Sequence, residues 1–215
     1  MFSIKSWWQS LHKAVKISII AIIIGCASGL ATYYFSTGQV THHDGAPAEI
    51  RGSVITLKTL KEDYFAELHN MFSNACRKGL DFPGVIDFAY MIRYLRELER
   101  RAQITKGIHN VIFDNGDNKP VGSIEVREAD PEDYGQLGMW INEKYWGGGR
   151  IQEALKLISK AYFDLYPEAK DYIAFARPWN QRSYKALLKA GFVDEGLKYA
   201  DKTPIWYQLR LHKKL

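Results

Sequence analysis

Three consecutive glycines join a predicted strand to a predicted helix within residues 136–154. The part before the glycines alternates bulky apolar residues with other residues, as a buried strand does. The part after them has apolar residues at helical spacing, namely Ile151, Leu155 and Ile158. Glycine reaches backbone angles closed to other residues, and the free N–H groups and dipole of a helix N-terminus favour an anion. The segment therefore predicts an anion-binding turn, and its alternative is a tight turn that binds nothing.

A second motif follows at residues 180–196, which read NQRSYKALLKAGFVDEG. Together with LGMWI at residues 137–141 and YWGGG at residues 145–149, it resembles the GNAT superfamily of acyl-CoA-dependent N-acetyltransferases. Within that superfamily it resembles the branch that modifies ribosomal-protein N-termini and related amines. The matching residues of the second motif are Asn180, Ser183, Leu187, Leu188, Lys189, Gly191, Phe192, Glu195 and Gly196. The resemblance covers roughly residue 51 to the C-terminus.

The resemblance implies an α/β (α+β) GNAT fold, with a mixed, mostly antiparallel sheet of about seven strands and flanking helices. The residue patterns follow the same order of elements. Strands are expected at residues 53–57, 109–113, 121–126, 136–141, 172–176, 192–197 and 204–211. Helices are expected at residues 61–73, 85–102, 150–165 and 180–189, with a break at residues 79–84.

The resemblance also implies that acetyl-CoA binds at the strand end and the glycine turn. The backbones of Met139 and Ile141 would pair with the pantetheine arm, and N–H groups of residues 147–151 would hold the pyrophosphate. The Arg150 guanidinium lies beside that phosphate or points to solvent. Asn180 bonds the pantetheine or an ordered water, caps the helix that follows it, or does both. The expected cofactor-binding residues are Met139, Ile141, Trp146, Gly147, Gly148, Gly149, Arg150, Ile151 and Asn180.

Three residues are the expected catalytic set: Ser183, Asn180 and Gln136. In the branch resembled, Ser183 lies near the cofactor sulfur and can protonate the leaving thiolate; its alternative is a helix serine bonded to its own backbone. Other branches have a tyrosine acid where this chain has Leu187, so Ser183 or water takes that role. Gln136 stands where the branch often has a glutamate, and an amide cannot accept a proton. The base is therefore a water relay, unless Glu125 on the neighbouring strand substitutes.

These features predict an N-acetyltransferase that moves an acetyl group from acetyl-CoA to an amine: a protein N-terminus, a lysine, a polyamine or a small-molecule amine. In the family, the first two helices border the acceptor site, so the aromatic rings there contact the acceptor or only the core; they are Phe82, Tyr90 and Tyr94. The alternative function is a catalytically degenerate GNAT module that senses CoA or scaffolds a partner. It is favoured by Gln136, Leu187 and Ile151.

The first 50 residues lie outside the resemblance. Residues 1–16 are basic, and residues 17–35 are apolar and uncharged, long enough to cross about 30 Å of hydrocarbon as a helix. We expect a transmembrane helix or signal anchor at residues 17–35, a linker at residues 36–50 and the acetyltransferase domain at residues 51–215. The alternatives are a cleaved signal peptide and a lipidated Cys26.

The side of the membrane is left open, because two arguments conflict. The lysines before the apolar run place the domain outside the cytosol, whereas acetyl-CoA is a cytosolic metabolite. Small residues at one helical face could pair two such helices; they are Ala21, Gly25 and Gly29. The net charge of +5 is mild, and without a basic stripe interleaved with aromatic residues we expect no nucleic acid partner. Cys26 and Cys76 offer no metal-ligand spacing, so no metal is expected, and Cys76 is expected on a helix.

Overall fold

The computed structural model describes residues 46–82, 87–104, 107–129, 134–200 and 203–213. The chain divides into two compact units, and the second, residues 42–215, contains all of these. The predicted basic segment, membrane segment, pairing face and Cys26 lie outside the described residues, as does most of the predicted linker. Among the helices that are described, none combines the length and apolarity needed to span a bilayer.

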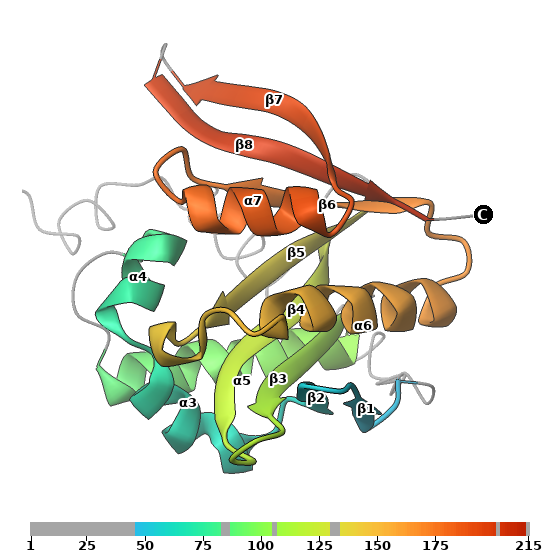
Figure 1. Cartoon of the computed structure of the whole chain (residues 1–215). Coiled ribbons are helices and arrows are strands. Elements are labelled where there is room, and N and C mark those ends of the chain that lie inside the picture. The colour runs from blue at the N-terminus through green and yellow to red at the C-terminus, as the bar shows by residue number, and fades with distance from the viewer. Residues whose placement is uncertain (1–45, 83–86, 105–106, 130–133, 201–202, 214–215) are drawn as a thin grey trace, which may run out of the picture. The chain divides into compact units, whose positions relative to one another are not determined.

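The described strands form a single sheet in the order β1-β2-β3-β4-β5-β6-β8-β7 (Figure 1). Neighbours are antiparallel except for β5 and β6, which are parallel, so the predicted mixed, mostly antiparallel sheet is confirmed. The strands are β1 (Glu49–Arg51), β2 (Ile55–Thr59), β3 (Ile108–Asp114), β4 (Pro120–Ala129), β5 (Tyr134–Ile141), β6 (Asp171–Ala176), β7 (Val193–Ala200) and β8 (Thr203–His212). The eighth strand is β1, a three-residue edge strand too short to show a residue pattern.

The helices cover both faces of the sheet. They are η1 (Glu62–Tyr64), α3 (Phe65–Met71), α4 (Asn74–Leu80), α5 (Phe88–Ile104), η2 (Glu143–Tyr145), α6 (Arg150–Leu165) and α7 (Gln181–Lys189). The single helix predicted at residues 61–73 is wrong, because η1 and α3 end by Met71 and α4 begins after Ser73. The Ser73 hydroxyl accepts a hydrogen bond from the Cys76 N–H, which caps the new helix and places Cys76 on it as expected.

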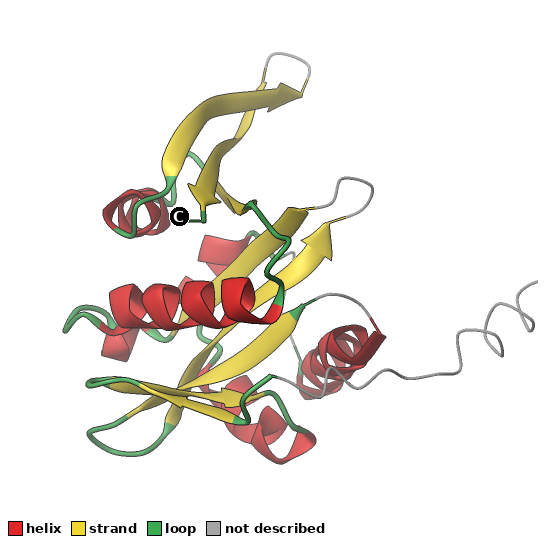
Figure 2. Cartoon of the chain, turned by 90° about the vertical axis from the view of Figure 1, so that its right-hand side faces the viewer, coloured by secondary structure: helices red, strands yellow, loops and turns green. Residues whose placement is uncertain are grey.

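Two hydrophobic cores hold these layers together. On one face, α6 buries Leu155 and Ile158 against the sheet, which confirms the predicted apolar face of that helix. On the other face, α3 and α5 bury Leu68 and Leu95 against β3. Complete burial of each such side chain contributes about 1.5–3 kcal/mol. Figure 1 and Figure 2 show α6 and α5 on opposite sides of the strands, and Figure 2 shows the β7–β8 hairpin extending away from them.

The parallel strands β5 and β6 pair over only three residues each. The last pair joins Leu137 to Ala174, and within the described strands no pairing continues beyond it. The remainder of β5, from Gly138 to Ile141, therefore has an edge open to a ligand. This break lies between the glycine turn and α7.

Candidate functional site

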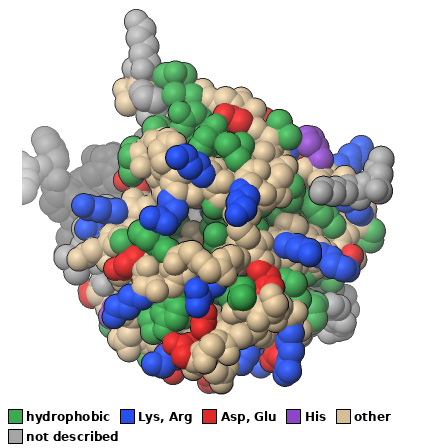
Figure 3. Space-filling view, viewed as in Figure 1, with side chains coloured by type: hydrophobic (Ala, Val, Ile, Leu, Met, Phe, Trp, Pro, Cys, Tyr) green, Lys and Arg blue, Asp and Glu red, His purple; other side chains and the backbone are tan. Residues whose placement is uncertain are grey.

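A cavity of about 680 Å³ opens where β5 and β6 separate, a volume within the usual range for small-molecule sites. Its walls come from α4, α5, β4, β5, β6 and α7, with Gly147 of the glycine turn and Ile151 of α6; Gly148, Gly149 and Arg150 lie outside the wall. In the view of Figure 3, Lys and Arg side chains lie around a hollow near the centre of the face. Every residue of the predicted catalytic set, Ser183, Asn180 and Gln136, lines this cavity.

The glycine turn has the backbone that the sequence predicted. Gly147, Gly148 and Gly149 have φ angles of +87°, +59° and +77°, a region where side chains are strained. Around Gly147 and Gly149 the space that a side chain would fill is open. Gly149 is the residue before α6 and offers no side-chain cap. The Arg150 N–H donates to the Gly147 carbonyl at 3.4 Å, and the N–H groups of Ile151 and Gln152, which have no acceptor among the described residues, are available to an anion.

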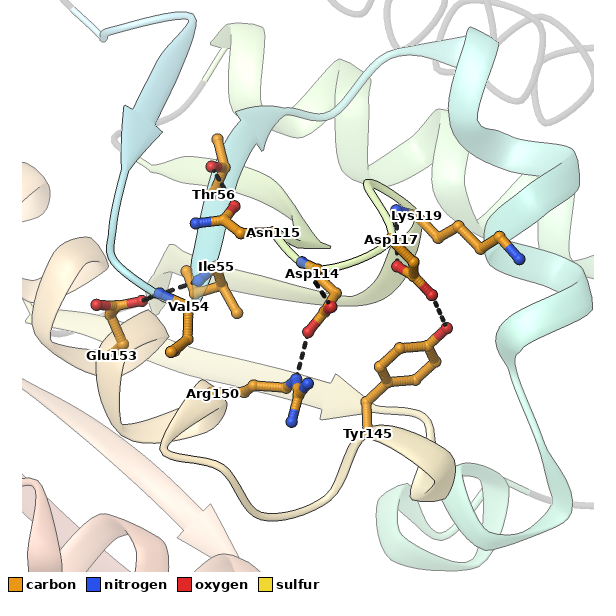
Figure 4. Close-up of polar contacts among 11 residues, drawn as sticks. Val54, Ile55, Thr56, Asp114, Asn115, Asp117, Lys119, Tyr145, Arg150 and Glu153 are labelled. Atoms are coloured by element: carbon orange, nitrogen blue, oxygen red, sulfur yellow. Dashed lines mark hydrogen bonds and ion pairs between the residues drawn. The ribbon is translucent and has the colours of Figure 1, made fainter.

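Arg150 does not point freely into solvent. Its guanidinium donates to the Asp114 carboxylate at the end of β3, and the same guanidinium packs against Gly148 (Figure 4). Burial raises the pKa of Asp114, but the hydrogen bond from Arg150 outweighs burial and the net pKa is lowered. The Tyr145 hydroxyl donates to Asp117 at 2.7 Å, so the β3–β4 turn holds the glycine turn from both of its sides.

Glu153 anchors the first turn of α6, a role that the sequence reasoning missed. Its carboxylate accepts hydrogen bonds of 2.6–2.9 Å from the Ser53 N–H and hydroxyl and from the N–H groups of Val54 and Ile55. Burial raises the pKa of Glu153, but these bonds outweigh burial and lower it to about 2. Figure 4 shows the carboxylate directed at the β1–β2 turn, away from Arg150.

Trp146 closes one end of the cavity. Its indole N–H donates to the Ile141 carbonyl at 3.0 Å, and the Arg182 guanidinium lies 3.9 Å from the ring centroid. Met139, Ile141 and Ile151 all line the cavity, and Ile151 also packs against the α6 core. The Ile141 carbonyl, one of the backbone groups expected to pair with pantetheine, thus accepts from the Trp146 indole and, at 3.5 Å, from the Cys76 thiol.

Asn180 caps α7 and also ties it to α4. Its side-chain oxygen accepts from the Ser183 N–H at 3.2 Å, and its amide donates to the Gly79 carbonyl at 3.0 Å. The Ser183 hydroxyl lies one turn into α7, on the cavity wall, and has no partner among the described residues. It is therefore free to donate to a ligand.

Glu125 is the buried carboxylate of the cavity, and residue patterns alone could not place it. It is 4% exposed, its Oε2 lies 2.9 Å from Nε2 of His109, and Arg127 donates to its other oxygen. Burial raises the pKa of Glu125, but the bonds to His109 and Arg127 outweigh burial and lower it. Its strand partner is Gly138, where a Cβ would come within 2.6 Å of Oε1, so only glycine leaves room for this carboxylate. This pairing is the signal that could have located Glu125.

Of the three aromatic residues expected at the acceptor site, two line the cavity and one does not. Phe82 and Tyr94 line the cavity, whereas Tyr90 is 42% exposed outside its wall. Burial, followed by the charge of Glu125, raises the pKa of Tyr94, so its hydroxyl stays protonated and can donate. His109, which no sequence argument singled out, is buried with its Nδ1 unpartnered among the described residues. No group of metal-ligating side chains occurs in the described ranges.

Comparisons with known proteins agree with this geometry. Residues 55–193 match the family profile described as "Acetyltransferase (GNAT) domain". No curated protein matches the chain.

Solved structures share the fold at low sequence identity. The microcin C7 self-immunity acetyltransferase MccE, solved in complex with acetyl-CoA and AMP, has a TM-score of 0.66 at 18% identity, over 80% of this chain and 98% of that one. An acetyltransferase from Salmonella typhimurium that modifies the N-terminal serine of 50S ribosomal protein L7/L12 has a TM-score of 0.65 at 15% identity, over 79% of this chain and 99% of that one. A GNAT-family acetyltransferase from Bacillus anthracis has a TM-score of 0.60 at 20% identity, over 75% of this chain and 95% of that one.

Proposed function

Because the chain belongs to the GNAT acetyltransferase family, we propose that its cavity binds acetyl-CoA between β5 and β6 and transfers the acetyl group to a primary amine held above Glu125. Family membership confirms the predicted enzyme class, an acetyl-CoA-dependent N-acetyltransferase, and the predicted cosubstrate. The observation that carries the assignment of the site is one continuous cavity. It joins the glycine turn, the Ser183 hydroxyl and the Glu125 carboxylate.

The cofactor would lie along the open edge of β5. Its diphosphate meets the N–H groups of the glycine turn and the first turn of α6, where the helix dipole is positive. Its pantetheine arm runs beside Met139 toward Ser183, in the gap that the separation of β5 and β6 leaves. To pair with the Ile141 carbonyl, the arm has to displace the Trp146 indole from it. Arg182, stacked on that indole, supplies a cation to this part of the cavity wall.

The reaction needs an amine nitrogen to attack the thioester carbon. A C–N bond forms, the C–S bond breaks, the nitrogen loses a proton and the thiolate gains one. A carboxylate with a lowered pKa takes a proton poorly from a free alkylammonium, whose pKa is about 10.4. It takes one readily from the nitrogen after attack, when that nitrogen is positively charged and acidic.

Glu125 fits the role of this proton acceptor, since Arg127 and His109 lie at ion-pair distance and lower its pKa, while Oε2 has no hydrogen-bond donor among the described residues. Ser183 fits the role of the donor to the departing thiolate. Gln136, on the same wall, offers an amide to orient the amine. Preorganised donors and acceptors of this kind each contribute about 10²–10⁴-fold to rate.

The location of the enzyme is a separate proposal. The uncharged residues 17–35 support a single membrane span, and dependence on acetyl-CoA supports a domain on the cytosolic side. Membrane fractionation followed by protease protection tests both parts. Recovery of the chain in the soluble fraction contradicts the span, and protection of the domain in spheroplasts or intact vesicles of known orientation decides the side.

The proposed activity is tested by thermal unfolding and by thiol release. Acetyl-CoA at 100 times its dissociation constant stabilises the folded state by about 2.7 kcal/mol. We expect that stabilisation and amine-dependent release of CoA thiol. Stabilisation without thiol release over a broad panel of amines favours the alternative, a CoA-sensing module. If millimolar acetyl-CoA causes neither stabilisation nor thiol release, both the acetyltransferase and the CoA-sensing module are contradicted.

A further inference from the structure

The acceptor side of the cavity combines several aromatic rings with a single buried carboxylate. We define the acceptor chamber as the part of the cavity lined by Phe82, Tyr94, Trp140, Phe175, Glu125 and Gln136. None of its four rings is fully buried, so each presents apolar surface to the cavity. They come from four different elements or connections, which surround the carboxylate.

Three of these rings are held in place by edge-to-face contacts with other rings. Phe82 and Tyr94 have centroids 5.4 Å apart, and Trp140 lies 5.0 Å from Phe72 on the segment between α3 and α4. Phe72 in turn lies 5.8 Å from Phe82. Such pairs add about 0.5–1.5 kcal/mol each beyond the area they bury. The chamber wall is therefore an ordered aromatic surface that a flat ring can contact without rearrangement.

The carboxylate lies directly over β5. Gly138 lies between Gln136 and Trp140 on the same face of β5, and Glu125 lies across from it on β4. The Glu125 side chain packs against Gly138, since a Cβ there would come within 2.6 Å of Oε1. An amino group bound to this carboxylate therefore has the Trp140 side chain on the same face of the sheet.

The charges of the chamber disfavour a second ammonium group. Within the described residues, only Glu97 and Glu125 supply carboxylates to the cavity wall. Each already has arginine partners: Arg127 donates to Glu125, and Arg100 and Arg101 pair with Glu97. The further ammonium groups of a polyamine would therefore find no carboxylate on the described cavity wall that lacks an arginine partner.

We propose that the acceptor is an aromatic monoamine, in which one primary amino group is joined by a short alkyl chain to an aromatic ring. This inference rests on the proposed function and specifies its substrate. The amino group lies at Glu125, the ring lies against Phe82 and Trp140, and the product is the N-acetyl amide with CoA thiol released. Polyamines are excluded as preferred acceptors.

The test uses the full-length chain in detergent with saturating acetyl-CoA and measures thiol release. We expect kcat/KM for 2-phenylethylamine to exceed that for spermidine by at least about tenfold, the factor that 1.4 kcal/mol supplies. Phe82→Leu and Trp140→Leu are expected to raise KM for 2-phenylethylamine several-fold and to leave KM for propylamine unchanged. Phe88→Leu is the matched control and should change neither value, because Phe88 lies on α5 outside the cavity wall, is 51% exposed and has its ring contact with His69.

The outcomes separate the inference from the function on which it rests. Equal or faster acetylation of spermidine overturns the inference and leaves the acetyltransferase standing. Unchanged KM for 2-phenylethylamine in Phe82→Leu overturns it as well, even if Trp140→Leu fails to fold. If acetyl-CoA binds and no amine is acetylated, the proposed function itself fails, and the inference fails with it.

Discussion

The carboxylate of Glu125 lies 2.9 Å from the imidazole Nε2 of His109; both residues are almost completely buried, and Glu125 is on the wall of the cavity. Neighbouring strands β4 and β3 bring the two together as direct partners across the sheet. A buried charge is costly unless it is paired and hydrogen-bonded. Arg127 donates a hydrogen bond to Oε1, and His109 lies at ion-pair distance from Oε2. Oε2 has no hydrogen-bond donor among the described residues, so it can still accept a proton.

Glu125→Gln tests this carboxylate. The variant keeps the shape of the side chain and removes the proton acceptor, so we expect kcat to fall by about 10²-fold or more while the dissociation constant of acetyl-CoA stays unchanged. Steady-state thiol release and a separate binding titration measure the two quantities. Glu125→Asp, which keeps a carboxylate, should recover part of the rate. A kcat within threefold of the wild type in Glu125→Gln contradicts the assignment.

Ser183→Ala tests the proton donor to sulfur. Loss of the hydroxyl should lower kcat about tenfold or more without weakening acetyl-CoA, because the backbone N–H that Asn180 caps is retained. Ser159→Ala serves as the control, since its hydroxyl bonds Tyr172 away from the cavity wall. An unchanged rate in Ser183→Ala would assign thiolate protonation to water.

Trp146→Phe tests whether the indole competes with the cofactor. The substitution removes the N–H that occupies the Ile141 carbonyl and keeps an aromatic ring beside Arg182. A hydrogen bond of this kind contributes about 0.5–1.5 kcal/mol, so acetyl-CoA should bind roughly 2- to 10-fold more tightly. Calorimetric titration measures the change, with Trp179→Phe as an exposed control. Weaker binding in Trp146→Phe would show that the indole N–H assists the cofactor.

Glu153→Gln tests the anchor of α6. Because the folded-state pKa of Glu153 is depressed to about 2, its contribution is present above its ordinary value of 4.5 and is lost as pH falls from there toward 2. We expect the variant to be less stable at pH 7 by about 1–2 kcal/mol, and the difference to shrink below pH 4.5. Urea unfolding across pH measures this. Glu67→Gln, on the exposed side of α3, should stay within 0.5 kcal/mol of wild type. A difference independent of pH rules out the charge as its source.

Local patterns predicted the strand, glycine turn and helix of residues 136–165 because their causes are local. Positive φ angles demanded glycine, and the spacing of Leu155 and Ile158 determined the buried face of α6. The cap formed by Asn180 was recognisable for the same reason. The family resemblance then supplied the order of the remaining elements.

The errors and omissions arose where distant segments meet. Register between β3 and β4 brings His109 to Glu125, and register between β4 and β5 sets Glu125 over Gly138; neither pairing is encoded in one segment. The bonds from Glu153 to the β1–β2 turn span about a hundred residues of sequence. The Ser73 cap was a local signal. It was missed because the helical spacing of apolar residues within 61–73 favoured one continuous helix ending at Ser73.

The most direct test of the central claim, that the amides of the glycine turn hold the cofactor, is a calorimetric titration of acetyl-CoA into wild-type protein and into Gly148→Ala. The Cβ of the alanine is strained at a φ of +59° and collides with the Arg150 guanidinium, which distorts the turn while leaving the catalytic side of the cavity intact. We expect saturable 1:1 binding to the wild type and at least about tenfold weaker binding to the variant, the effect of losing 1.4 kcal/mol. Equal affinity of the two proteins, or no binding to the wild type, would contradict it.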